Sequence, residues 1–473
     1  MQQYAGREPN SKTNTSIMHK DRKIELQGLL PKSAEHILYQ YQHDRRALTA
    51  ENFCEVIQLQ ELLEFLHTRI SVASPGRKTK VYFLEGKMVI ICPELAENFA
   101  PKLNTNDRVK VNFKEFSIMT KFIFYAAHEM TFKVSAADYG KLSGAPTLIS
   151  LANLMNDSRA YKAQRKIASL QKEVIQYLFP KNQVKITPFE DRKNWIVHCK
   201  SNDEKQLRFV DALIYNHYSA PAIIQGIVGS GKSHLCSDII ITHLKNNASA
   251  KVVILAGNNL AIDSLAEKVL EKIPEVRLAR PVSQKWVENL PTRMAAEGVK
   301  FDKVEEAVAV LGSNIELVAM TADTALGVPN EAGPEADLIL FDEAAMSFEA
   351  HNCYAIAPFF GPKTTTIFCG DIYQLKMLAL SPHAKLLRID VSPMQRLLEL
   401  EPIYAMERNL NSKYPIAIYL TTCYRLPPEV AELIGRFYPF KIYSNPDPIK
   451  NARYINLPNM PKGNIIFHPV KVE

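Results

Sequence analysis

The stretch from Gly226 to Ser233 constrains the fold of this chain more than any other segment. It reads Gly-Ile-Val-Gly-Ser-Gly-Lys-Ser, which fits the phosphate-binding pattern Gly-x-x-x-x-Gly-Lys-Ser/Thr. An apolar run at residues 222–225 precedes it, and a helical pattern follows Lys232. Because this loop joins a buried strand to a helix, the sequence predicts a parallel α/β nucleotide-binding domain here.

Each residue type in the loop suits a nucleoside triphosphate. Glycines let the backbone turn its N–H groups toward phosphate oxygens, and the helix N-terminus adds positive potential. We expect Lys232 to neutralise the β- and γ-phosphates and Ser233 to bind Mg²⁺, so the predicted cofactors are ATP and Mg²⁺. The predicted nucleotide-binding residues of the loop are Gly226, Gly229, Ser230, Gly231, Lys232, Ser233 and His234.

An acidic pair follows a later apolar run. Asp342 and Glu343 come directly after residues 338–341, at the expected end of a neighbouring strand. There Asp342 would hold Mg²⁺ and Glu343 would activate the attacking water. Gln374 follows a further β-like run and would sense the γ-phosphate. The alternatives are an acidic strand end without catalysis and a plain strand-to-loop turn.

From residue 221 onward, apolar runs and helical patterns alternate, which predicts a parallel sheet with helices on its faces. The preceding part contains β-like runs between two helical stretches, and these suggest a small β-barrel or sandwich. The predicted organisation is a disordered lead-in (1–30), a helical stalk (31–72 and 151–200) interrupted by a small β-barrel (73–150), a RecA-like NTPase domain (201–415), and, as the likeness of residues 422–429 to a known family implies, the start of a second, incomplete RecA-like domain (416–473).

Composition excludes several classes of protein. The seven cysteines are scattered, odd in number and never in a Cys-x-x-Cys pair, which favours reduced thiols and no zinc module. No run approaches the ~18 apolar residues of a membrane span, and residues 1–20 lack the apolar centre of a signal peptide. We therefore expect a cytoplasmic protein with no membrane partner, and a nuclear location is the alternative.

Charge is distributed unevenly. Residues 1–220 carry 32 basic and 23 acidic side chains, whereas residues 221–473 carry 25 and 27. A basic half suits a polyanionic partner such as nucleic acid, because bound phosphates release counterions. An ordinary solvated surface explains the charge equally well.

The phosphate loop, the acidic pair and Gln374, in this order, resemble the motifs of superfamily 1 helicases of the Up-frameshift-like branch. Residues 252–265 resemble motif Ia of that family, with Asn259 and Asp263 at its recurring polar positions, and residues 318–325 resemble motif Ic, with Thr321 as its hydroxyl residue. The resemblance implies that these three residues contact single-stranded nucleic acid. The alternative is two ordinary strand-to-helix loops with polar caps.

Two further residues complete the site that the resemblance implies. The stretch at residues 422–429 is similar to the first motif of the second motor lobe, whose arginine, here Arg425, would reach the γ-phosphate. Gln206, twenty residues before Gly226, is similar to the family's adenine-reading glutamine. The implied catalytic residues are Lys232, Asp342, Glu343, Gln374 and Arg425.

The first half of the chain adds a narrower likeness. Residues 48–53, 93–98 and 106–109 resemble the stalk and β-barrel of Armitage-type RNA helicases of small-RNA silencing. The resemblance implies single-stranded RNA as the partner, in preference to DNA, together with proteins of a small-RNA pathway. The resemblance does not imply an oligomeric state for the protein.

The chain also departs from the family pattern. Ile227, Val228 and Ser230 replace the usual prolines and threonine of the loop, Met346 replaces a glutamine, and residues 376–377 replace prolines. Only 48 residues follow Arg425, whereas a second α/β lobe needs roughly 100–200. We therefore expect weak hydrolysis from this chain alone. A fragment, a separately encoded remainder and a degenerate isoform all explain this, and a nucleotide-gated RNA-binding scaffold or a DNA-directed helicase are the alternative functions.

Overall fold

The computed structural model of the chain describes three long stretches and several short ones. The long stretches are 184–282, 334–379 and 387–445. The short ones are 49–54, 56–57, 60, 80–84, 87–91, 108–113, 117–126, 129–135, 138, 148–153, 166–167, 169–180, 315–330 and 384–385. The predicted lead-in at 1–30 and the last residues, 446–473, lie outside them.

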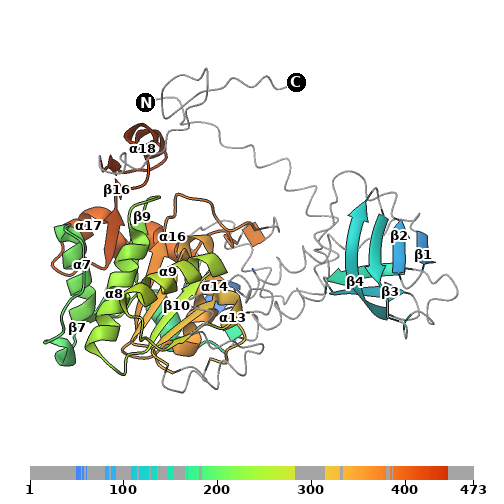
Figure 1. The fold of residues 1–473 in the computed structure, drawn as a ribbon, viewed down its shortest axis with the longest axis horizontal. Coiled ribbons are helices and arrows are strands. Elements are labelled where there is room, and N and C mark those ends of the chain that lie inside the picture. The colour runs from blue at the N-terminus through green and yellow to red at the C-terminus, as the bar shows by residue number, and fades with distance from the viewer. Residues whose placement is uncertain are drawn as a thin grey trace.

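A seven-stranded sheet forms the centre of the larger unit (Figure 1). All its neighbouring strands run parallel. Its central strands are buried at every position, as expected for a sheet covered on both faces. This confirms the predicted α/β fold class with a parallel, RecA-like sheet. In spatial order the strands are β11 (Leu278–Ala279), β12 (Leu317–Thr321), β10 (Val252–Ala256), β13 (Leu338–Asp342), β14 (Thr365–Gly370), β9 (Ala222–Gly226) and β15 (Ala417–Leu420).

The strands follow the apolar runs of the sequence, with one addition. β15 lies beyond the predicted domain boundary at residue 415, yet it pairs with β9 as the edge strand of the same sheet. The sheet therefore extends past that boundary. β15 has only four residues, and nothing in their sequence indicates to which sheet the strand belongs.

Helices cover the sheet, and α8 and α9 pack side by side across it (Figure 1). Polar caps set several helix starts: Asp203, Asn258 and Ser392 each accept a hydrogen bond from a backbone N–H two or three residues later. The α-helices that lie wholly within the described stretches are α6 (Lys172–Leu178), α7 (Glu204–Tyr215), α8 (Lys232–Asn246), α9 (Asn259–Lys272), α13 (Ala322–Ala325), α14 (Glu349–Ile356), α16 (Pro393–Leu400), α17 (Met406–Leu410) and α18 (Pro428–Gly435).

Short elements connect these helices and strands. Two small sheets pair β7 (Ile186–Pro188) with β8 (Asn216–Tyr218) and β16 (Thr422–Cys423) with β17 (Tyr443–Ser444). The 3-10 turns are η2 (Glu190–Arg192), η3 (Ala344–Met346), η4 (Ala357–Phe359) and η5 (Pro402–Tyr404).

A second sheet is antiparallel and six-stranded, in the order β1-β2-β5-β4-β3-β6. It falls almost entirely within the predicted β module. Met88, Val111, Ile118 and Phe132 supply buried apolar side chains. Among the described residues the edge strands β1 and β6 do not pair, so closure into a barrel stays a prediction. The strands are β1 (Lys80–Leu84), β2 (Lys87–Ile91), β3 (Arg108–Phe113), β4 (Ser117–Ala126), β5 (Glu129–Lys133) and β6 (Leu148–Asn153).

Parts of the predicted stalk pack on the α/β unit. Thr49 and Asn52 exchange N–H to side-chain hydrogen bonds at the start of a helical stretch that includes residues 53–54 and 56–57. Phe53 and Tyr177 belong to the same apolar core as the large sheet. None of the helices in the described stretches combines the length and apolar character that a bilayer-crossing segment requires.

Candidate nucleotide-binding site

The phosphate loop joins β9 to α8 and has a left-handed backbone at two glycines. Gly229 has φ 68° and Gly231 has φ 88°, which glycine adopts without the steric cost of a Cβ. In the described part of the chain, the backbone N–H groups of Gly231, Lys232 and Ser233 donate to no protein acceptor. The loop therefore offers free donors at a helix N-terminus, the arrangement that binds phosphate.

Lys232 reaches back over this loop. Its Nζ donates to the carbonyl oxygens of Gly226 at 2.9 Å and Ile227 at 3.3 Å. A Cβ on Gly226 would lie 2.7 Å from Lys232 Cγ, so a glycine is needed beneath the lysine side chain. The ammonium group is thus held directly above the phosphate-binding backbone.

A cavity of about 1200 Å³ opens over the loop. It brings together most of the predicted site. Two residues of the predicted nucleotide site do not line it but contact or adjoin residues that do: Gly226, whose carbonyl accepts from Lys232, and Asp342, which directly precedes Glu343 and is 5% exposed. The predicted residues that line it are Gln206, Gly229, Ser230, Gly231, Lys232, Ser233, His234, Glu343, Gln374 and Arg425.

The acidic pair lies at the end of β13, two strands from β9. The pKa of Asp342 is raised to about 6, mainly by burial and also by the neighbouring Glu343 charge, while the Glu343 N–H and Lys232 oppose the shift. Glu343 has a left-handed backbone with φ 51°, and its N–H donates to Asp342 Oδ1 at 3.0 Å. A non-glycine residue in this region is strained, and such strain is often found at functional sites.

The oxygen donors present suit Mg²⁺. Ser233 supplies a hydroxyl in the cavity and Asp342 a buried carboxylate beside it, and hard divalent cations prefer such ligands. Because burial makes the charged form of Asp342 unfavourable, a bound cation would stabilise this carboxylate more than it would an exposed one. The described residues contain no cluster of three or more His, Cys, Asp or Glu side chains, so the remaining ligands would come from phosphate and water.

Asp371 joins three parts of the site and was not predicted. Its Oδ1 accepts from Gln225 Nε2 at 2.7 Å, and its Oδ2 accepts from Gln374 Nε2 at 2.9 Å and Tyr438 Oη at 2.6 Å. Burial raises the pKa of Tyr438, and its hydrogen bond to Asp371 raises it further. The strand before the phosphate loop, the predicted sensor Gln374 and the C-terminal segment thus meet at one carboxylate.

Arg425 lines the cavity from an exposed stretch that contacts the phosphate loop closely. Tyr424 N donates to Gly229 O at 2.8 Å, and a Cβ on Gly229 would lie 2.5 Å from Arg425 Cβ. Ile227, one of the departures from the family pattern, packs with Cys423 and Ala431 in a small core. The apolar residue at that position therefore binds the C-terminal segment to the phosphate loop.

Asn259 and Asp263 lie away from the cavity and face a buried arginine. Arg280 Nε donates to Asp263 Oδ1 at 2.7 Å, and its Nη2 donates to Asn259 Oδ1 at 2.8 Å. Arg280 is 1% exposed, and burial lowers its pKa while Asp263 opposes this. The two side chains satisfy a buried charge at the start of α9, and their contact with nucleic acid stays a prediction.

Thr321 also has a structural partner. Its Oγ1 accepts from Thr324 N at 3.1 Å and caps α13. Lys166, from the predicted stalk, donates to the carbonyl oxygens of Ala325 and Val328 just beyond that helix. Burial lowers the pKa of Lys166 to about 7. The stalk thus holds the loop on which the predicted nucleic-acid contact lies.

Comparison with known proteins adds one sequence relative. No protein-family model matches the chain. It is 24% identical over 245 residues to the Saccharomyces cerevisiae protein named "Putative ATP-dependent RNA helicase ECM32", a match that covers 44% of this chain and 20% of that protein. The chain therefore spans about a fifth of the length of this curated relative. The match supports a relation to helicases.

Solved helicase structures align at low similarity. The helicase nonstructural protein 10 of an arterivirus has a TM-score of 0.31 and 14% identity, over 81% of this chain and 61% of that one. Its complex with DNA gives 0.30 and 12%, over 77% and 59%. The UvsW helicase of bacteriophage T4 gives 0.27 and 12%, over 42% and 62%. This chain thus spans about six tenths of each.

Proposed function

We propose that the protein is an ATP-dependent motor of the helicase type that acts on single-stranded RNA, as a helicase or a ribonucleoprotein remodeller. One observation carries the proposal. The phosphate loop with Lys232 and Ser233 borders the same cavity as Glu343, directly beside the buried carboxylate of Asp342. Phosphate-binding and water-activating groups in one cleft are what triphosphate hydrolysis requires.

The roles follow from the positions of these side chains. Lys232 and the free N–H groups of the loop bind the β- and γ-phosphates, and Gln206 faces the nucleoside side of the cavity. Mg²⁺, when held by Ser233 and Asp342, neutralises charge on the phosphate oxygens. Glu343 accepts the proton of the attacking water, and Arg425 stabilises charge on the transferred phosphoryl group.

The choice of RNA and of a biological setting rests on separate observations. The basic first half of the chain suits a nucleic-acid backbone, and the named relative is an RNA helicase by description. We further propose a role in small-RNA silencing, in the cytoplasm, with a nuclear location as the alternative; the resemblance of the first half of the chain to Armitage-type helicases supports this proposal. Pathway proteins would then be its partners.

ATP hydrolysis by the purified chain tests the proposal. We expect low ATPase activity that increases with single-stranded RNA, and Lys232→Ala should reduce it by on the order of a hundredfold because one preorganised charge is lost. Unchanged turnover in Lys232→Ala would refute the site. Competition between single-stranded RNA and DNA at one fixed salt concentration tests the preferred strand, because phosphate contacts alone depend steeply on salt.

A nucleotide-gated RNA-binding scaffold is the second candidate. Met346 and the residues at 376–377 depart from the pattern through which related motors couple nucleotide to strand. Gln374 also donates its amide to Asp371. A scaffold would bind ATP and RNA but hydrolyse ATP at the same low rate with and without RNA.

A further inference from the structure

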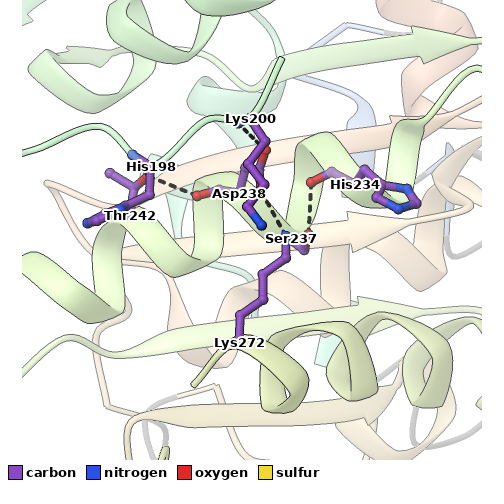
Figure 2. A network of polar contacts seen from close by, with 7 residues as sticks. All are labelled: His198, Lys200, His234, Ser237, Asp238, Thr242 and Lys272. Atoms are coloured by element: carbon purple, nitrogen blue, oxygen red, sulfur yellow. Dashed lines mark hydrogen bonds and ion pairs between the residues drawn. The ribbon is translucent and has the colours of Figure 1, made fainter. Parts of the chain in front are cut away.

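An extended segment before α7 is bound along the side of α8. Three of its backbone N–H groups, at alternate residues, donate to side chains of that helix. Ile196 N reaches Asn246 Oδ1 at 2.8 Å, His198 N reaches Thr242 Oγ1 at 3.0 Å, and Lys200 N reaches Asp238 Oδ2 at 2.9 Å. Figure 2 shows the residues of two of these contacts, His198 with Thr242 and Lys200 with Asp238. We call the three acceptor side chains, Asp238, Thr242 and Asn246, the α8 ladder.

The three hydrogen bonds can form together because the spacing of the acceptors on the helix matches the spacing of the donors on the segment. Its side chains are four residues apart on a helix and so are spaced by about 6 Å along the axis. Alternate residues of an extended chain are spaced by about 6.6 Å. The helix face therefore substitutes for a neighbouring strand, with one acceptor for every second N–H of the segment.

Each acceptor is itself held in place. Thr242 Oγ1 donates to Asp238 O at 2.8 Å, and Asn246 Nδ2 donates to both Thr242 O and Ile196 O at 2.8 Å. Lys272 of α9 donates to Asp238 Oδ1 at 2.9 Å, which leaves Oδ2 for the segment (Figure 2). A hydrogen-bonded side chain loses less rotamer freedom when it binds, so the ladder is preorganised.

The segment runs toward the phosphate loop, because Ile196 lies near the C-terminal end of α8 and Lys200 near its N-terminal half. From Lys200 on, the segment forms part of the wall of the 1200 Å³ cavity that the phosphate loop also lines: the segment's lining residues are Lys200, Ser201, Asn202, Asp203 and Gln206. In the described part of the chain, Gln206 has no side-chain hydrogen bond to protein. Polar groups of this kind, free and aimed at a cavity, can read the edge of a base.

We propose that Asp238, Thr242 and Asn246 are positioning residues for nucleoside recognition. One helix then carries both halves of the site: its N-terminus holds the phosphates, and its flank fixes the wall that contacts base and ribose. This inference rests on the proposed nucleotide site and assigns the ladder a role in affinity for the nucleoside, separate from affinity for the triphosphate.

Thr242→Val tests this inference. The substitution keeps side-chain volume but removes the acceptor of His198 N, and the hydroxyl is restored in the control Thr242→Ser. Isothermal titration calorimetry in Mg²⁺ measures binding of two probes: the non-hydrolysable ATP analogue AMP-PNP, and inorganic tripolyphosphate, which has no nucleoside. We expect Thr242→Val to weaken AMP-PNP binding by about threefold to tenfold, the range for one lost hydrogen bond, with tripolyphosphate affinity unchanged.

Several outcomes would overturn the inference. Equal weakening of both probes would mean that the substitution disturbs the whole site or the folded fraction, and wild-type affinity for AMP-PNP would mean that the ladder does not position the wall. Asn246→Ala, at a less buried position near the helix end, should likewise weaken binding of AMP-PNP relative to tripolyphosphate. It replaces Thr242→Val as the test if that variant fails to fold. Binding of neither probe to the wild-type chain would overturn the proposed function as well.

Discussion

Asp342→Asn is expected to stabilise the free protein while it removes the proposed Mg²⁺ ligand. The buried Asp342 carboxylate has its pKa raised from 3.8 to about 6, mainly by burial. Between these two values the unfolded chain releases the proton and the folded chain keeps it, so ionisation costs stability as pH increases. The folded protein therefore carries the full cost at neutral pH and none of it at pH well below 3.8.

The size of this cost follows from the shift. About two units at about 1.36 kcal/mol each give about 3 kcal/mol at pH 8, and about half of that at pH 5, where the folded group is mostly protonated. Asparagine has the same shape and no charge, so the variant avoids the cost. For a domain of this size, about 3 kcal/mol corresponds to an increase in melting temperature of roughly 6–12 °C.

Thermal unfolding in EDTA, followed by circular dichroism at pH 5 and pH 8, measures the effect. Glu343→Gln is the matched comparison: it removes one charge next to the buried group but leaves the buried carboxylate itself, so its gain should be smaller. Asp342→Asn should also lose ATPase activity. A melting temperature equal to or below that of the wild type at pH 8, or a gain that does not fall at pH 5, would refute the reasoning.

Three further predictions follow from individual contacts. Gly229→Ala should weaken nucleotide binding and reduce the melting temperature, because it adds strain at φ 68° and a Cβ 2.5 Å from Arg425 Cβ; calorimetry and thermal melts check this. Tyr438→Phe should reduce RNA-stimulated ATPase activity with little change in KM for ATP, because it frees Asp371 from the C-terminal segment; steady-state kinetics decide, and an unchanged kcat contradicts it. In the wild type, the pKa of Lys166 is lowered from 10.5 to about 7, so between these pH values the unfolded chain holds a proton that the folded chain has lost, and stability increases with pH. Lys166→Met removes this group, so its stability should increase less over the same range, and melting temperatures measured from pH 7 to about 10.5 test this.

Local pattern was enough to predict the phosphate loop and most of the parallel sheet. A buried strand, a glycine turn and a helix are adjacent in the chain, so their chemistry and order can be read without knowing the fold. The same holds for Asp342 and Glu343, because the C-terminal ends of parallel strands meet at one edge of a sheet.

Contacts between distant segments were not readable in this way. Arg280 belongs to no recognised motif, yet it donates hydrogen bonds to the side chains of Asn259 and Asp263, for which the sequence had predicted contact with nucleic acid. Asp371 accepts from residues 146 and 67 positions away along the chain. A buried polar group must be paired, but only the packed structure decides with which partner.

The sequence by itself determined the fold class and the chemistry of the phosphate loop, because both depend on residues close together in the chain. Tertiary structure alone decided that β15 completes the sheet, that Ile227 packs against the C-terminal segment, and that the flank of α8 holds the extended segment before α7, which continues into the wall of the cavity. These depend on the register between elements that the chain separates, and burial of apolar surface and pairing of buried polar groups set that register in three dimensions.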